Sequence, residues 1–153
     1  MGFQHIAVAT DFSAGADLAF DTALALARQH QARLEVVHVI PPLITPTPLL
    51  DDMMVTEVSL RLSENLDQAA RQEMQSRFLD RCQGLEARAM VLEGDPAREL
   101  LRFCDEEGVD LLVVGSTGLT GLSGVLFGSV AAKVVRRATC SVMVVRSRPA
   151  QDA

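Results

Sequence analysis

Strand-like and helix-like segments alternate along almost the whole chain. Short runs rich in Val, Ile and Leu predict five β-strands, at residues 3–9, 33–40, 85–92, 110–114 and 141–145. The segments between them show helical periodicity, so a single helix joins each strand to the next. Strands joined in this way pack side by side in parallel with right-handed crossovers. The pattern therefore predicts an α/β fold with a doubly wound parallel sheet.

Local signals set the expected helix boundaries. Ser13 is placed to cap a first helix that runs to about Gln31, and Asp95-Pro96 marks a sharp start for a third helix that stops at Gly108. A long second helix is expected from about Ser59 to Gly84. Four of the six prolines precede it in the segment 41–56, which is therefore expected to be a long connection of the kind that often binds partners. A fourth helix is expected over 130–137.

Length, charge and cysteine content narrow the class of protein. The 153 residues suit one domain, expected to span 1–147 with a frayed tail at 148–153, and 48% hydrophobic content supports a packed core. The net charge of −6 argues against a nucleic-acid partner, since such partners are bound by basic surfaces. No apolar run approaches the ~20 residues of a membrane span. Three widely spaced cysteines and the lack of a visible signal peptide indicate a cytoplasmic protein.

Glycine is concentrated in one place. Five of the ten glycines fall between residues 115 and 128, interleaved with serine and threonine, between the strand 110–114 and the helix 130–137. Glycine allows the backbone to lie close against a ligand, and a helix start offers unpaired N–H groups to an anion. This arrangement predicts a phosphate-binding loop. The alternative is a simple surface connection.

A second polar segment, Ala9-Thr10-Asp11, ends the first strand. Ligands of open α/β sheets bind at the carboxyl ends of strands where the strand order reverses, so this segment and the glycine run are expected to line one crevice. Asp11 is a candidate for ribose hydroxyls or a metal ion, or else it caps the first helix or hydrogen-bonds its own backbone. His38 is expected to be a hydrogen-bonded core histidine. No histidine has the spacing of a metal site, so protein side chains alone are not expected to hold a metal.

The glycine run matches neither the Walker pattern nor the dinucleotide fingerprint. It also contains no basic residue, because no lysine or arginine lies between Arg102 and Lys133. Phosphate charge would therefore be met by backbone N–H groups, by a bound Mg²⁺ and by loop hydroxyls, those of Ser116, Thr117, Thr120, Ser123 and Ser129.

The spacing Gly115-x2-Gly118-x9-Gly128-Ser129 resembles the pattern of ATP-binding universal stress proteins. Further similar blocks are the opening Ile6-Ala-Val-Ala-Thr-Asp-Phe-Ser13, Val37-His-Val39, Gly94-Asp-Pro96, the segment 108–116 and the last strand, 140–146. The resemblance covers nearly the whole chain. It departs at two positions, because many relatives carry histidine where this chain has Thr117 and a basic residue where it has Leu119.

The resemblance implies a five-stranded sheet in the order 3-2-1-4-5, ATP bound at the switch point, and a cytoplasmic homodimer. It places the nucleotide against twelve residues: Ala9, Thr10, Asp11, Val39, Val114, Gly115, Ser116, Thr117, Gly118, Gly128, Ser129 and Val130. The apolar strand 141–145 would lie at a sheet edge, where symmetric pairing with a second copy forms a dimer. The connection 41–58 is a candidate surface for a protein partner.

The function expected from the sequence is that of a nucleotide-responsive stress protein. No residue set supports fast catalysis, because a general base and a charged clamp for phosphoryl transfer are both missing from the loop. Two alternatives stay open. One is a dimeric interaction module that binds AMP, a cyclic nucleotide or no nucleotide, and the other is a slow ATPase or autophosphorylating protein.

Overall fold

The computed structural model describes residues 2–43, 52–117 and 127–147. Strands and helices alternate along them, with a short 3₁₀ turn after the second helix. Their bounds are β1 (His5–Ala9), α1 (Ala14–His30), β2 (Arg33–Ile40), α2 (Asp52–Arg77), η1 (Leu79–Arg81), β3 (Ala87–Glu93), α3 (Pro96–Glu107), β4 (Leu111–Gly115), α4 (Ser129–Arg137) and β5 (Ser141–Val145).

The five strands form one parallel sheet in the order β3-β2-β1-β4-β5, which confirms the expected fold and strand order. β1 lies at the centre, with Ala9 beside Val37 of β2 and Val8 beside Val113 of β4. The chain leaves β1 towards β2 and β3 on one side, and β4 leads to β5 on the other. The switch in direction therefore falls between β1 and β4.

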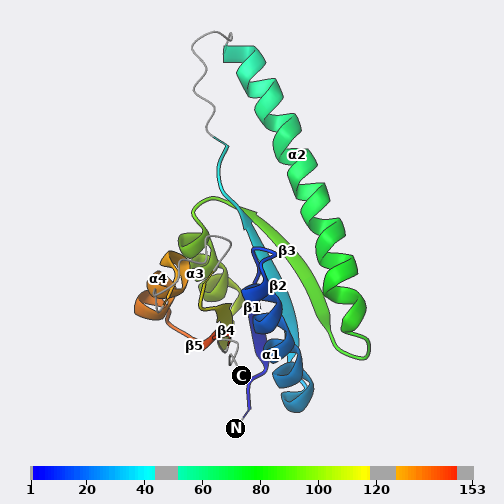
Figure 1. Cartoon of the computed structure of the whole chain (residues 1–153), viewed down its shortest axis with the longest axis vertical. Coiled ribbons are helices and arrows are strands. Elements are labelled where there is room, and N and C mark those ends of the chain that lie inside the picture. Colours follow the sequence, from blue (N-terminus) through cyan, green and yellow to red (C-terminus); the bar gives the residue numbers. More distant parts are fainter. Residues whose placement is uncertain (1, 44–51, 118–126, 148–153) are drawn as a thin grey trace, which may run out of the picture.

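Helices cover both faces of the sheet, with α1 and α2 on one side and α3 and α4 on the other (Figure 1). Alternate side chains of β1 point to opposite faces, so Ile6 and Val8 join the core under α1 and α2, and Ala7 joins the core under α3 and α4. Phe20 of α1 and Phe78, which follows α2, are fully buried against each other with ring centroids 4.7 Å apart. Burial of each such side chain contributes about 1.5–3 kcal/mol.

The caps of α1 and α3 lie where the sequence predicts them. The Ser13 hydroxyl accepts a hydrogen bond from the Ala16 N–H, and the Asp95 carboxylate accepts one from the Arg98 N–H. Gly108 ends α3 with φ of 66°, in the left-handed region that favours glycine. The strand bounds differ from the expected ones by at most two residues at the ends of β1, β3 and β4.

The predicted bounds of α2 are wrong at both ends. The helix begins at Asp52, not near Ser59, so the second part of the expected connection 41–58 is helical, while 44–51 lie outside the described residues. The α-helix ends at Arg77 rather than near Gly84, because η1 follows with hydrogen bonds from the Arg81 and Cys82 N–H groups to the carbonyls of Phe78 and Leu79. The amino-terminal half of α2 extends past the carboxyl ends of the strands (Figure 1). Neither α2 nor any other described helix is long and apolar enough to cross a bilayer.

Candidate nucleotide pocket at the switch point

A cavity of about 370 Å³ opens at the carboxyl ends of β1 and β4. Its size is within the range of small-molecule sites. All of the predicted site residues that the structure describes line it; Gly118 lies outside the described residues. Further lining residues are mostly apolar and were not singled out from the sequence: Ala16, Val37, Pro41, Pro96, Leu100 and Ala131. Pro96 and Leu100 are one turn apart at the start of α3. This helical spacing, which places them on one face, was visible in the sequence.

The backbone extends the sheet ladder into the cavity wall. The Thr10 N–H donates to the Val37 carbonyl, and the Ser116 N–H donates to the Val145 carbonyl, each at 2.9 Å. The Ser116 carbonyl in turn accepts from the Gly128 N–H at 2.6 Å, which brings the start of α4 beside the end of β4. The two segments on either side of the glycine run therefore meet at the pocket.

The start of α4 has no side-chain cap. Gly128 occupies the N-cap position without a side-chain acceptor, in contrast to Ser13 and Asp95 at the starts of α1 and α3. The first N–H groups of a helix have no partner within the helix and carry a partial positive charge. Because Ser129, Val130 and Ala131, the first three residues of α4, all line the cavity, these donors belong to its wall. A helix start of this kind is suited to binding an anion.

Two glycines allow α1 and β4 to approach closely. A Cβ on Gly115 would lie 2.9 Å from the Gly15 carbonyl oxygen, and a Cβ on Gly15 would lie 2.8 Å from the Thr117 carbonyl oxygen. Gly115 is therefore required for packing, whatever ligand the pocket holds. Gly15 was missed in the sequence, although the run of small residues 13–16 marks a close contact.

Asp11 and His38 both hydrogen-bond the backbone around the cavity. The Asp11 carboxylate accepts a hydrogen bond from the Ser13 N–H at 3.0 Å, which is one of the local roles that the sequence left open. Asp11 also lines the pocket. His38 was expected to lie in the core, but it is only half-buried. Its Nδ1 lies 2.8 Å from the Thr10 carbonyl oxygen, so the ring donates there, and the histidine is hydrogen-bonded as predicted.

Among the described lining residues there is no lysine or arginine, and the described part of the chain contains no cluster of acidic, histidine or cysteine side chains that could hold a metal ion. A phosphorylated ligand would meet helix and loop N–H groups and the hydroxyls of Thr10, Ser116, Thr117 and Ser129. Its ring system would meet the apolar side of the cavity.

These features define a class: a parallel α/β domain with a cavity at its switch point. The sequence matches the universal stress protein family over residues 2–146, and the chain belongs to that family. It is 32% identical to the universal stress protein YxiE of Bacillus subtilis over 94% of this chain and 99% of that one.

Solved structures show the same likeness. The universal stress protein UspA from Lactobacillus plantarum superimposes with a TM-score of 0.76 at 28% identity, over 95% of this chain and 99% of that one. A universal stress protein crystallised in complex with cAMP superimposes with a TM-score of 0.69 at 27% identity, over 95% and 98% of the two chains. The family assignment therefore rests on nearly the whole chain and not on the glycine pattern alone.

Proposed function

We propose that this protein binds an adenine nucleotide in the switch-point cavity, with ATP and Mg²⁺ as the leading ligand, and acts as a nucleotide-responsive dimer. The observation that carries the proposal is the uncapped start of α4, whose first residues lie in the wall of a cavity that is lined in large part by apolar side chains. The cAMP complex of a related universal stress protein adds support.

The proposal assigns roles to the lining residues. Val39 and the neighbouring apolar side chains take the base, the segment Ala9 to Asp11 lies beside the ribose, and Val114 to Thr117 leads to the phosphates. Gly128, Ser129 and Val130 bind the phosphate tail, with Gly118 as a further member. Mg²⁺ would be held through the phosphates, with Asp11 as a candidate ligand. No residue is assigned a catalytic role.

A nucleotide with fewer charges is the second candidate. The described cavity wall contains no lysine or arginine to offset the charge of a triphosphate. AMP or a cyclic nucleotide requires less compensation by positive charge. Titration of nucleotide-stripped protein with ATP-Mg²⁺, AMP and cAMP ranks these candidates directly.

The edge strand β5 is the proposed dimer contact. It pairs with β4 on one side only, and its apolar residues Val142 to Val145 are partly exposed. Pairing of this edge with that of a second copy would extend the sheet by symmetry. Sedimentation of a Met143→Lys variant beside the wild type tests this contact, because a lysine on an edge strand opposes pairing.

A matched pair of variants tests the pocket. Ser129 is exposed at the start of α4, so we expect substitutions there to leave the fold intact. Ser129→Asp places a carboxylate where we expect phosphate, while Ser129→Asn has nearly the same shape without charge. We expect Ser129→Asp to weaken nucleotide binding by about tenfold or more, the effect of about 1.4 kcal/mol. Its free energy of unfolding should be equal or slightly higher, since acidic residues stabilise helix starts.

Calorimetric titration and thermal melting provide the readouts. A ligand at 100 times its Kd stabilises the wild type by about 2.7 kcal/mol, a shift of several degrees. Ser129→Asn should retain most of this shift, and adenosine should bind all three proteins alike. Absence of binding by any nucleotide to the wild type, or equal binding by the two variants, would contradict the proposal.

A further inference from the structure

The loop Thr10 to Ser13 faces two different parts of the molecule. Thr10 and Asp11 line the nucleotide cavity. Phe12, the next residue, faces the opposite way and lines an apolar groove beside α2. One short loop therefore contacts both the proposed ligand site and the longest described helix.

Phe12 has an unusual backbone conformation. Its φ is +62°, and the described residues contain only one other non-glycine residue with positive φ, Gln31, which ends α1. A large side chain rarely adopts this conformation unless its surroundings impose it. The Phe12 N–H donates to the Thr10 hydroxyl at 3.0 Å, and its ring packs against His38 with centroids 4.6 Å apart.

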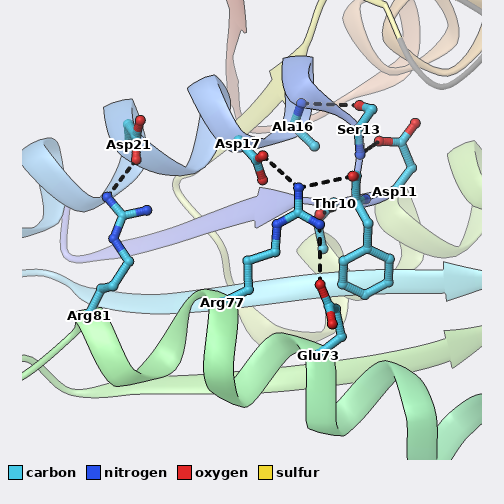
Figure 2. A network of polar contacts seen from close by, with 10 residues as sticks. Thr10, Asp11, Ser13, Ala16, Asp17, Asp21, Glu73, Arg77 and Arg81 are labelled. Carbon is cyan, nitrogen blue, oxygen red and sulfur yellow. Dashed lines mark hydrogen bonds and ion pairs between the residues drawn. The ribbon is translucent and has the colours of Figure 1, made fainter.

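Arg77 supplies the remaining constraint from α2. One of its terminal nitrogens, Nη2, donates to the Phe12 carbonyl at 3.1 Å and to Asp17 of α1 at 2.6 Å. The other, Nη1, reaches Glu73 one turn earlier on α2 at 3.3 Å. Figure 2 shows the guanidinium at the meeting point of the loop, α1 and α2. The planar fork of arginine suits this several-way contact, which a lysine cannot reproduce.

We infer that Arg77 is a positioning residue for the nucleotide site: it fixes the conformation of the loop Thr10 to Ser13 from behind, so that ligand binding and the packing of α2 are coupled. This inference rests on the proposed nucleotide binding. The coupling is reciprocal by linkage, so a nucleotide that orders the loop also tightens the contact with α2. Nucleotide binding in the cavity would thereby affect the packing of α2, a helix that does not line the cavity.

Arg81 offers a matched control. It lies one turn further along and also joins the α2 region to α1, through an ion pair of 2.7 Å with Asp21. Its guanidinium lies over the Phe20 ring at 5.0 Å, away from the loop Thr10 to Ser13 (Figure 2). Loss of Arg81 therefore weakens the same two-element contact without touching the loop.

The test compares Arg77→Met, Arg77→Lys and Arg81→Met with the wild type by titration with ATP-Mg²⁺ and AMP. We expect Arg77→Met to raise Kd by about tenfold, a typical size for coupling between sites. Arg77→Lys should behave similarly, and it keeps the positive charge should the methionine variant fold poorly. Arg81→Met should lose as much stability in urea but bind within about twofold of the wild type.

Amide hydrogen exchange gives a readout that a purely structural role would not move. Nucleotide should slow exchange in residues 70–78 of the wild type and of Arg81→Met, but not of Arg77→Met. Equal Kd values for wild type and Arg77→Met would overturn this inference and leave the proposed function standing. Failure of the wild type to bind any nucleotide would instead overturn the proposed function, and the inference with it.

Discussion

Polar groups are arranged differently at the two ends of the sheet. At the amino end, Glu35 is 1% exposed and its carboxylate pairs with Arg88 of β3. It also lies 3.1 Å from Nε2 of His5, although the two atoms are not aligned for a hydrogen bond. Arg33 donates to the other nitrogen of the same ring at 2.7 Å. The charged side chains at this end therefore pair with one another.

At the carboxyl end, polar groups are turned towards a cavity. α4 begins without a side-chain cap, and the hydroxyls of Thr10 and Ser116 stand in the pocket wall. The comparison teaches where to look for function in such a sheet. Charges that pair with one another contribute to folding, whereas donors in the wall of an open cavity are available to bind a ligand.

The largest expected effect is a loss of stability caused by a substitution at the amino end of the sheet. Glu35→Gln removes a buried charge, so Arg88 keeps only the more exposed Glu107 as an anionic partner and His5 loses the carboxylate beside it. Breaking a buried ion pair costs about 3–5 kcal/mol, and we expect about 3 because Arg88 is half exposed and regains water. Urea unfolding measures this loss, while the nucleotide Kd of the folded variant should stay unchanged.

Glu107→Gln is the matched control, since Glu107 is the second and more exposed partner of Arg88. It should cost less than about 1 kcal/mol. Equal destabilisation by both variants, or a changed nucleotide Kd in Glu35→Gln, would contradict the separation of a structural amino end from a ligand-binding carboxyl end.

A change at the carboxyl end should affect both folding and binding. In Gly115→Ala the new methyl group would meet the Gly15 carbonyl at 2.9 Å. Overpacking of this kind costs about 1–3 kcal/mol, and the displaced Ser116 and Thr117 should lose ligand contacts. Melting with and without nucleotide measures both effects.

Gly84→Ala serves as the control for that variant. Gly84 has φ of +79° with open space around it, so alanine there is strained but not crowded. We expect a loss of about 1 kcal/mol and unchanged nucleotide binding. A Gly115→Ala protein that melts lower but binds normally would argue that the glycine serves packing alone.

The smallest expected effect depends on pH and belongs to the amino end. Burial raises the pKa of the Cys104 thiol above its ordinary 9.0, and Cys140, Asp105 and Glu35 raise it further. The folded protein keeps this proton when the unfolded chain releases it. Stability is therefore complete below pH 9 and falls as the pH rises above it, by about 1.4 kcal/mol at about pH 10.

Cys104→Ala removes this part of the alkaline loss. Burial also raises the pKa of Cys82 and Cys140, so a smaller slope should persist in the variant. Urea unfolding of the reduced proteins at about pH 7.5 and about pH 10 compares the two slopes. Identical slopes would mean that the pKa of Cys104 is the same in the folded and unfolded states.

Sequence patterns predicted the elements well where a strong local signal existed. Ser13, Asp95 and Gly108 mark helix ends through their own hydrogen bonds or backbone conformation, and each lies where it was placed. The start of α2 was missed because the prolines before it and the paired methionines within it suggested a connection. An ion pair between Glu57 and Arg61, at the spacing of one helical turn, was the signal that favoured a helix there.

The sequence by itself determined the order of strands and helices, the caps of α1 and α3, and the family. These follow from periodicity, short motifs and likeness along the chain. Only the tertiary structure decided that Glu35 meets Arg88, that Gly15 crowds Gly115, and that Arg77 reaches Phe12. The physical reason is that each of these contacts joins residues far apart in sequence, so its geometry depends on how whole elements pack and not on the local pattern of either one.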